Sequence, residues 1–289
     1  MTVSSTAPLA DHDRAIRARA ASARRVVIKV GTNVVMQDDG RLAMARLYAL
    51  AESIAALRRA SRDVVLVSSG AIGLGVQRLG LGERPSALAL KQACAAVGQG
   101  RLMGLYTDAF DRLDVVAAQV LLTEDDFAVA DRYHNLHATL GALLDIGAVP
   151  IVNENDTVST AELERADGAG RAPIFGDNDK LSALIATKIE ADLLVLLSDV
   201  DGVFTANPAL DPNATLIPTI DAITPDVLSA AQGGGTRGRG GMATKLDAAR
   251  IATDAGVCTV IANGRAPSVV DRVCGGDAVG TLFVPRSAQ

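Results

Sequence analysis

Apolar residues along the chain form two kinds of pattern, which predict strands and helices in alternation. Val26 to Val30 is a short β-branched run that only Lys29 interrupts, and such a run predicts a buried strand. Farther along, Leu47, Leu50 and Ile54 repeat at the spacing of one helix face. Strands that are apolar throughout, rather than at alternate positions, are typical of a mostly parallel sheet that helices cover on both faces.

The same two patterns continue toward the end of the chain. Further strands are predicted at residues 63–70, 115–122, 148–156, 192–202, 256–264 and 280–284. Helices are predicted at about 71–79, 86–113, 132–146 and 181–189, near Asp226, and from about Met242. There is no internal repeat and no clear interdomain linker, so this order of elements predicts an α/β fold.

Several of the predicted strands stop in small or polar residues. Their endings read "KVGTN", "VSSGA", "VNEND" and "LSDVDG". In open α/β sheets, ligands bind at the carboxyl ends of the strands, where loop glycines and serines let backbone N–H groups reach a phosphate. Any strand must end in a turn, and turns favour these residues. Four such endings together nevertheless indicate one shared polar cleft.

Composition narrows the class of protein. The chain has 289 residues and a formal net charge of −5, which argues against a general nucleic-acid binder. Its three cysteines are scattered and form no CxxC pair, so the sequence predicts a reducing cytoplasm rather than a disulfide framework or a zinc site. No apolar run reaches membrane-spanning length. Residues 1–25 lack the apolar region of a secretory signal and read as a mobile extension with a short basic helix.

Lys29 is the first candidate for chemistry. A lysine inside an apolar strand is unfavourable to bury unless its charge is matched, although a lysine on an edge strand can extend to water. Gly31, Thr32 and Asn33 follow at once and offer backbone donors beside this positive charge. The combination suits an anionic phosphate.

The stretch "IFGDNDKLSAL", residues 174–184, places two carboxylates and an amide where a helical pattern begins. Asp177 can cap this helix and Asp179 can lie in its first turn, because carboxylates accept hydrogen bonds from the free N–H groups there and suit the positive helix end. Capping needs only one aspartate. The second aspartate and Asn178 therefore indicate a further role.

The stretch "GGGTRGRGGMATK", residues 233–245, is rich in glycine. It matches GxGxxG by letters, but no strand precedes it and the chain has no Walker A sequence, so the match is weak. It reads either as a flexible linker or as a phosphate-covering loop. Arg237, Arg239 and Lys245 add positive charge, and the glycines lead into a helix whose N-terminus favours anions.

Two further features of the sequence are assigned no chemical role. His134 and His137 lie one helical turn apart without a third metal ligand nearby in the sequence, and we interpret them as an exposed helix face. The charged stretch "ERADGAGRAP", residues 164–173, is either solvated or a lid. Lysines and aspartates without a nucleophile triad point toward phosphoryl transfer, which needs mostly positioning and charge neutralisation. The residues alone thus predict a phosphate-handling α/β enzyme.

Six segments, in order along the chain, carry a family resemblance. They are "VVIKVGTNVV", "VSSGAIGLG", "KQACAAVGQG", "VPIVNENDTV", "FGDNDKLSAL" and "GRGGMATKLDAA". Together they resemble the glutamate 5-kinases (γ-glutamyl kinases), a branch of the amino acid kinase family, from about Val26 to Val284. The resemblance implies an αβα sandwich around a mainly parallel sheet. It also implies ATP-dependent phosphorylation of the L-glutamate γ-carboxylate to L-glutamyl 5-phosphate, the first step of proline biosynthesis.

The resemblance carries roles over to the matching positions. Lys29 and Lys245 match the two lysines that meet the ATP phosphates, and Asp177 and Asp179 match the paired aspartates that organise the lysines and the metal. These four are the expected catalytic residues. Mg²⁺ is the expected metal, and no residue is assigned as its direct ligand. The expected glutamate contacts are Ser69, Asp156 and Asn178.

The nucleotide site is expected at two further segments. The expected nucleotide-binding residues are Lys29, Ser198, Asp199, Arg239, Gly240, Gly241, Met242, Ala243, Thr244 and Lys245. The family more usually has threonine where Ser198 stands. It commonly has "GTGGM" where this chain reads "GRGGM", so Arg239 either adds a phosphate contact or alters nucleotide affinity. The segment at 164–174 is also longer than is usual in the family.

The resemblance also implies an organisation and a set of partners. Residues 1–25 are expected to be the extension and 26–289 the kinase domain, without the C-terminal PUA domain of many members. Expected partners are glutamate, ATP, proline as feedback inhibitor, glutamyl phosphate reductase, and further copies of the chain in a homo-oligomer, but neither nucleic acid nor membrane. Two alternatives stay open. One is another amino acid kinase, acting on acetylglutamate, a nucleoside monophosphate or a small phosphate ester; the other is a non-catalytic glutamate or proline sensor.

Overall fold

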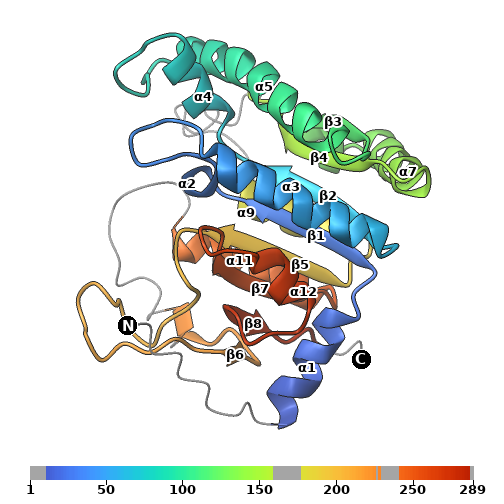
Figure 1. The fold of residues 1–289 in the computed structure, drawn as a ribbon, viewed down its shortest axis with the longest axis vertical. Coiled ribbons are helices and arrows are strands. Elements are labelled where there is room, and N and C mark those ends of the chain that lie inside the picture. The colour runs from blue at the N-terminus through green and yellow to red at the C-terminus, as the bar shows by residue number, and fades with distance from the viewer. Residues whose placement is uncertain (1–10, 159–176, 226, 229–240, 287–289) are drawn as a thin grey trace.

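The computed structural model describes residues 11–158, 177–225, 227–228 and 241–286, and these residues contain a central sheet of eight strands (Figure 1). The strands are β1 (Arg25–Val30), β2 (Asp63–Ser68), β3 (Ala117–Leu122), β4 (Val149–Glu154), β5 (Leu193–Ser198), β6 (Thr219–Ile220), β7 (Cys258–Asn263) and β8 (Thr281–Phe283). Their order across the sheet is β3-β4-β2-β1-β5-β7-β8-β6. All neighbouring strands are parallel except β7 and β8, which confirms the mostly parallel sheet.

Helices cover both faces of this sheet (Figure 1). They are α1 (Asp11–Ala21), α2 (Thr32–Val35), α3 (Met44–Arg59), α4 (Ala71–Arg78), α5 (Leu88–Asp111), α6 (Asp125–Ala128), α7 (Ala130–Asp145), α9 (Asn178–Lys188), α11 (Met242–Asp254) and α12 (Val269–Cys274). Around the helix expected near Asp226, residues 225, 227 and 228 are described and are helical, and the other predicted helices are present. None of the helices in the described part of the chain has the length and apolar composition needed to cross a bilayer.

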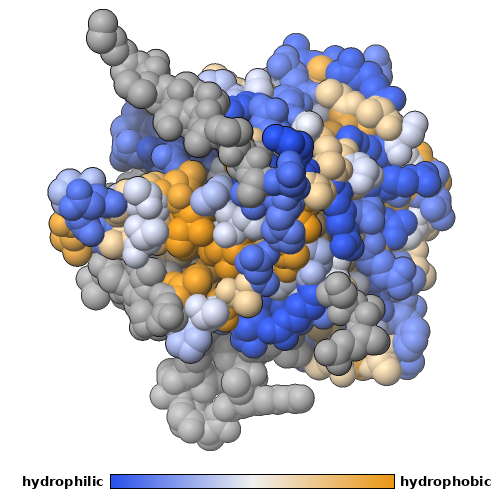
Figure 2. All heavy atoms as spheres, turned by 90° about the horizontal axis from the view of Figure 1, so that it is seen from below, coloured by the Kyte–Doolittle hydropathy of each residue, from blue (hydrophilic) through white to orange (hydrophobic). Residues whose placement is uncertain are grey.

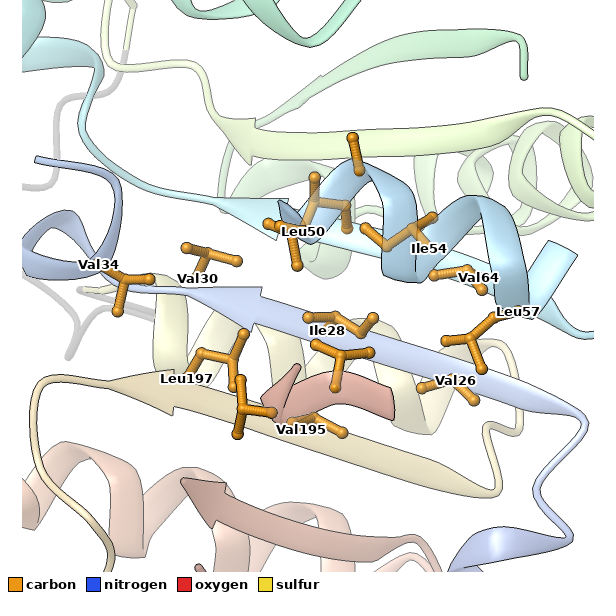
Figure 3. Packing of buried hydrophobic residues seen from close by; sticks show 14 of the residues in the cluster. Val26, Ile28, Val30, Val34, Leu50, Ile54, Leu57, Val64, Val195 and Leu197 are labelled. Carbon is orange, nitrogen blue, oxygen red and sulfur yellow. The ribbon is translucent and has the colours of Figure 1, made fainter. Parts of the chain in front are cut away.

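Alternation of side chains along β1 divides the apolar core between the two faces. Val26, Ile28 and Val30 belong to the cluster that packs against α3 (Figure 3). Val27 belongs to a second cluster, together with residues of α7, α9 and α11. Because successive side chains of a strand point to opposite faces, Lys29 lies on the same face as Val27. The strand therefore directs this lysine toward α9 and α11.

Two glycines bring α4 and α5 into backbone contact. A Cβ atom on Gly98 of α5 would lie 1.7 Å from the Ala71 carbonyl oxygen, and one on Gly75 of α4 would lie 1.9 Å from the Cys94 carbonyl oxygen. No larger residue fits at either position without separating the helices. The contact holds α4, which begins directly after the turn that follows β2, in a fixed position against α5.

The predicted short basic helix of the N-terminal extension is present as α1. Arg17 is buried, and its guanidinium donates to the carbonyl oxygens of Pro218, Asp277 and Val279 over 2.9–3.3 Å. These bonds attach α1 to the segments that lead into β6 and β8. Figure 2 shows this end of the molecule, where hydrophobic residues gather at the centre of the face among hydrophilic ones. The mobility of the extension and the division of the chain at residue 25 stay predictions.

Candidate active site

The carboxyl ends of the parallel strands bring the polar strand endings together. Lys29 lies near the end of β1, Ser69 follows β2, Asn153 lies near the end of β4, and Ser198 ends β5. These four strands are neighbours in the sheet, in the order β4-β2-β1-β5. The polar strand endings that the sequence predicts to share one cleft therefore lie together at the carboxyl-terminal side of the sheet, where α9 and α11 also begin.

Lys29, Asp179 and Lys245 form a buried triad of charged groups at this side of the sheet. Lys29 Nζ lies 2.6 Å from Asp179 Oδ1, and Lys245 Nζ lies 3.2 Å from Asp179 Oδ2. The exposed fractions of the three side chains are 7%, 1% and 5% in chain order. Two ammonium groups share one carboxylate, so the three side chains together carry one net positive charge. Such a cluster attracts an anion, because charges interact strongly where water is excluded.

The two aspartates of the "GDND" stretch have different partners and opposite pKa shifts. Burial alone would raise the pKa of Asp179, but Lys29, Lys245 and the Thr244 hydroxyl outweigh burial and lower it. Burial raises the pKa of Asp177, and the nearby charge of Asp179 adds to this rise. The Lys180 N–H donates to Asp177 Oδ1 over 3.0 Å, so Asp177 caps α9 as predicted. Asp179 is the residue that organises the lysines.

Asn178 lies between these aspartates and faces an uncharged cluster. Its Nδ2 is 2.8–3.0 Å from Asn153 Oδ1, Ser69 Oγ and the Ser68 carbonyl oxygen. Asn153 Nδ2 donates in turn to Gln99 Oε1 over 2.8 Å. Two of the three expected glutamate contacts, Ser69 and Asn178, are thus brought together. Because Nδ2 is directed at protein acceptors, Oδ1 is the atom that Asn178 can offer to a ligand.

Two members of this cluster were not predicted as site residues. Asn153 opens the "NEND" motif and Gln99 lies in "KQACAAVGQG", so both belong to segments that carry the family resemblance. A polar residue near the end of a predicted strand was the signal that could have identified Asn153. Nothing in the sequence pairs it with Gln99, which lies 54 positions away. Asp156, the third expected glutamate contact, is half-buried in the turn after β4, and its role stays a prediction.

Asp199, an expected nucleotide contact, is held by side chains from two segments. Asn33 Nδ2 donates to Asp199 Oδ2 over 2.8 Å, and Ser198 Oγ donates to Asp199 Oδ1 over 3.1 Å. Burial alone would raise the pKa of Asp199, but its hydrogen bonds, chiefly that from Asn33, lower it. Arg265 adds a link that was not predicted, because its guanidinium donates to the Asn33 carbonyl oxygen over 3.2 Å and to Asp38 over 2.9 Å.

The turn after β1 differs from the prediction in one respect. The Gly31 N–H donates to the Leu197 carbonyl oxygen over 3.1 Å, so it is not the backbone donor to phosphate that the sequence suggested. Glycine has a different use here. A Cβ atom at Gly31 would lie 3.6 Å from Lys29 Nζ, so the absence of a side chain keeps the space beside the ammonium group open.

The described part of the predicted nucleotide loop forms the start of α11. Gly241, Met242, Ala243 and Thr244 are its N-cap and first turn. Arg239 and Gly240 lie outside the described residues. A glycine N-cap has no side chain to occupy the first-turn N–H groups, and the positive end of a helix favours an anion. The start of α11 therefore adds a positive pole beside Lys245.

These features fit a polyphosphate better than they fit a metal ion. An ATP phosphate is an anion of the kind that two neighbouring ammonium groups attract. Both oxygens of Asp179 already contact ammonium groups, and the described residues contain no group of three His, Cys, Asp or Glu side chains able to hold a metal ion. The aspartates expected to organise the metal thus face lysines and helix backbone. His134 and His137 lie on an exposed helix face, as predicted.

Comparison with known proteins agrees with this geometry. Residues 24–263 match the amino acid kinase family. "Glutamate 5-kinase" of Gloeobacter violaceus is 50% identical over 259 residues, which are 89% of this chain and 68% of that protein. "Glutamate 5-kinase" of Moorella thermoacetica is 46% identical over 275 residues, which are 95% of this chain and 70% of that protein.

Solved structures resemble the chain at lower sequence identity. An isopentenyl phosphate kinase has a TM-score of 0.60 at 19% identity, and the match covers 90% of this chain and 100% of the other. UMP kinase from Bacillus anthracis has a TM-score of 0.58 at 21% identity, and the match covers 92% and 98%. At such identities the likeness shows the fold alone. It confirms the αβα sandwich expected from the sequence.

Proposed function

Because the chain belongs to the amino acid kinase family, we propose that it is a glutamate 5-kinase, which transfers the γ-phosphoryl group of ATP to the γ-carboxylate of L-glutamate. The product is L-glutamyl 5-phosphate, formed in the first step of proline biosynthesis. The observation that carries the proposal is the Lys29–Asp179–Lys245 triad. The triad lies at the carboxyl ends of the strands, where ligands of α/β folds bind, and its two ammonium groups suit the phosphates of ATP.

Direct in-line transfer accounts for the residues present. A glutamate γ-carboxylate oxygen attacks the γ-phosphorus, the bond from that phosphorus to the bridging oxygen breaks, and the electron pair leaves with ADP. The attacking carboxylate is already an anion, so no general base is needed. The enzyme must instead stabilise negative charge on the transferred group and on ADP. We assign this role to Lys29 and Lys245, and no covalent phosphoenzyme is expected.

The uncharged cluster is the proposed glutamate site. Asn178 Oδ1 is an acceptor and suits the α-ammonium group of an amino acid, while Ser69 Oγ can both accept from Asn178 and donate to a ligand. Asp156, as a carboxylate near the same strand ending, suits the same ammonium group. Ser198 and Asp199 at the end of β5, together with residues 239–243 and Lys245, are the proposed nucleotide contacts.

The proposal also covers the metal, inhibition by proline, the partners and the location of the protein, for which the described residues offer fewer contacts. Mg²⁺ is expected to arrive bound to the phosphates of ATP, because the oxygens of Asp179 are engaged by the lysines. Proline is expected to inhibit by resembling glutamate at the same cluster. Hand-off of the product to glutamyl phosphate reductase, assembly into a homo-oligomer and a cytoplasmic location stay predictions. The role of Arg239 stays a prediction as well.

A single assay of acceptor acids tests the proposal. ADP release is measured with L-glutamate, N-acetylglutamate, UMP and isopentenyl phosphate, each with and without proline. Hydroxylamine is included in a parallel set, because an acyl phosphate reacts with it to give a stable hydroxamate. We expect glutamate-dependent ADP release with an equal amount of hydroxamate. Turnover of another acceptor instead of glutamate would contradict the proposal, and glutamate or proline binding without turnover would indicate the sensor.

A further inference from the structure

Thr244 contacts the carboxylate that organises the two lysines. Its Oγ1 lies 2.8 Å from Asp179 Oδ2 and 2.9 Å from the Gly241 carbonyl oxygen. From the sequence, Thr244 is expected only as one of the nucleotide-loop residues. Thr244 precedes Lys245 in the first turn of α11, and this position also brings its hydroxyl group to Asp179, a contact that the sequence motif does not reveal.

The hydroxyl can serve only one of these two acceptors fully at a time. A threonine hydroxyl carries one hydrogen. A carboxylate accepts more strongly than a backbone carbonyl, because hydrogen bonds to charged groups are shorter and stronger. Asp179 is 1% exposed, so bulk water does not compete for its oxygens. The hydrogen bond from Thr244 to Asp179 is therefore the favoured one, and it is among the contacts that lower the pKa of Asp179.

This hydrogen bond restricts how the carboxylate can turn. Lys29 contacts one oxygen of Asp179, while Lys245 and Thr244 contact the other. The terminal torsion of an aspartate is broad, so two flexible lysines alone would leave the carboxylate free to rotate and to share its oxygens differently. The position of the Thr244 hydroxyl oxygen depends on a single side-chain torsion, whereas each lysine ammonium group lies at the end of a flexible four-carbon stem, so Thr244 is the stiffest of the three partners.

Resting on the proposed kinase function, we propose that Thr244 is a positioning residue, which fixes the Asp179 carboxylate so that one oxygen serves Lys29 and the other serves Lys245. The two ammonium groups are thereby held apart at a set separation. That separation decides whether both reach the phosphates at the moment of transfer. Thr244 acts on this view through Asp179 and not through a contact of its own with the nucleotide.

Three substitutions separate this role from its alternatives. Thr244→Val removes the hydroxyl but keeps the shape, and Thr244→Ser restores a hydroxyl without the methyl group. The matched control is Thr253→Val on the same helix, where the hydroxyl donates to the Ala249 carbonyl oxygen over 2.8 Å, within α11 itself. For each variant kcat, the KM values for ATP and glutamate, the ATP dissociation constant and the melting temperature are measured.

We expect Thr244→Val to lower kcat by roughly 10-fold, the loss typical of one hydrogen bond to a charged group, while the ATP KM and dissociation constant stay within about 2-fold. Thr244→Ser should recover most of the lost kcat, and Thr253→Val should keep the parental kcat. Parental kcat in Thr244→Val would overturn the proposal. So would a raised ATP dissociation constant at unchanged kcat, which would mean direct nucleotide contact, or an equal loss of kcat in the valine and serine variants.

The unsubstituted enzyme provides a separate test of the proposed function. If it releases no ADP with glutamate, the assignment of glutamate fails, and the Thr244 comparison is made with whichever acceptor is turned over. If it does turn over glutamate, only the ratio of each variant to the parent decides the role of Thr244. The two failures therefore give different results in the same experiment.

Discussion

Replacing Asp179 by asparagine tests the triad on which the proposed mechanism depends. Asparagine has nearly the same shape, so Asp179→Asn removes a negative charge and leaves the packing almost unchanged. Lys29 and Lys245 would then lie close together without the carboxylate between them. Both are almost fully buried, so water can offset little of their mutual repulsion. The variant should be less stable than the parent and should lose most of its activity.

The size of the effect follows from the burial of all three groups. Removing one partner of a buried ion pair costs about 3–5 kcal/mol, because the remaining charge is left uncompensated. Two ammonium groups depend on Asp179, which places the expected loss of unfolding free energy in that range. A typical domain has only about 5–15 kcal/mol in total. The variant should therefore unfold at a clearly lower urea concentration, although it should still fold.

Urea unfolding of four proteins measures this loss. They are the parent, Asp179→Asn, the double variant Asp179→Asn with Lys245→Met, and Asp177→Asn as the matched control. Asp177 lies on the same helix turn but caps the helix, a role that asparagine performs equally well. The double variant should be more stable than Asp179→Asn, because methionine removes one of the two buried ammonium groups and keeps most of the side-chain volume.

The pH dependence of the unfolding free energy tests independently whether the charged Asp179 carboxylate stabilises the fold. The contacts around Asp179 lower its pKa below the ordinary value of 3.8, so its stabilising contribution is fully present above that pH. The contribution is lost as the pH falls through the lowered pKa, and the difference between parent and Asp179→Asn should shrink there. A loss of less than about 1 kcal/mol at neutral pH, together with parental kcat, would refute the reasoning that the triad is a coupled charged unit.

Three further predictions concern other parts of the structure. Asn178→Ala should lower the glutamate kcat/KM by roughly 10- to 100-fold and the unfolding free energy by about 1–3 kcal/mol, since its Nδ2 serves three partly buried acceptors. The ATP affinity of this variant, measured by titration, should stay unchanged. Asp177→Asn should match or exceed the parent in stability at neutral pH, because the pKa of Asp177 is raised in the folded protein and its stabilising contribution is therefore lost as the pH rises through that pKa. Urea midpoints at several pH values measure this dependence. Asp177→Ala should lower the unfolding free energy by about 1 kcal/mol, because it removes the helix cap. Gly98→Ala should lower the melting temperature sharply because its Cβ would lie 1.7 Å from a backbone oxygen, whereas Gly104→Ala on the open side of the same helix should raise stability by up to about 1 kcal/mol.

The layers of the fold were predictable because the strands are apolar throughout. Runs such as that at residues 193–197 are buried on both faces, which only a sheet covered on both sides allows. The same property hides strand direction, so nothing in the run at 281–283 indicates that β8 is antiparallel to β7. The helices α2 and α6, of four residues each, and β6, of two, are too short for periodicity to appear.

The residues of the site were predictable singly, but their contacts were not. Lys29 attracts attention because a lysine interrupts an apolar strand. Its partner Asp179 lies in a different motif, and no spacing rule connects the two. From the sequence, Asn178 is expected only as a glutamate contact. The structure gives it a second role, because Asn178 joins a partly buried amide cluster with Asn153.

The contacts of the first turn of α9 explain why three polar residues stand side by side there. Successive residues of a helix point about 100° apart, so Asp177, Asn178 and Asp179 face three different directions from nearly the same height. The cap faces back along the helix axis, the amide faces the ends of β2 and β4, and the second carboxylate faces the lysines of β1 and α11. Exchanging Asn178 with either aspartate would put a charge against the amide cluster, and exchanging it with Asp179 would also leave the lysines facing a neutral group. The order of the residues, and not only their composition, is therefore what sets the proposed glutamate-binding cluster beside the charges proposed to bind phosphate.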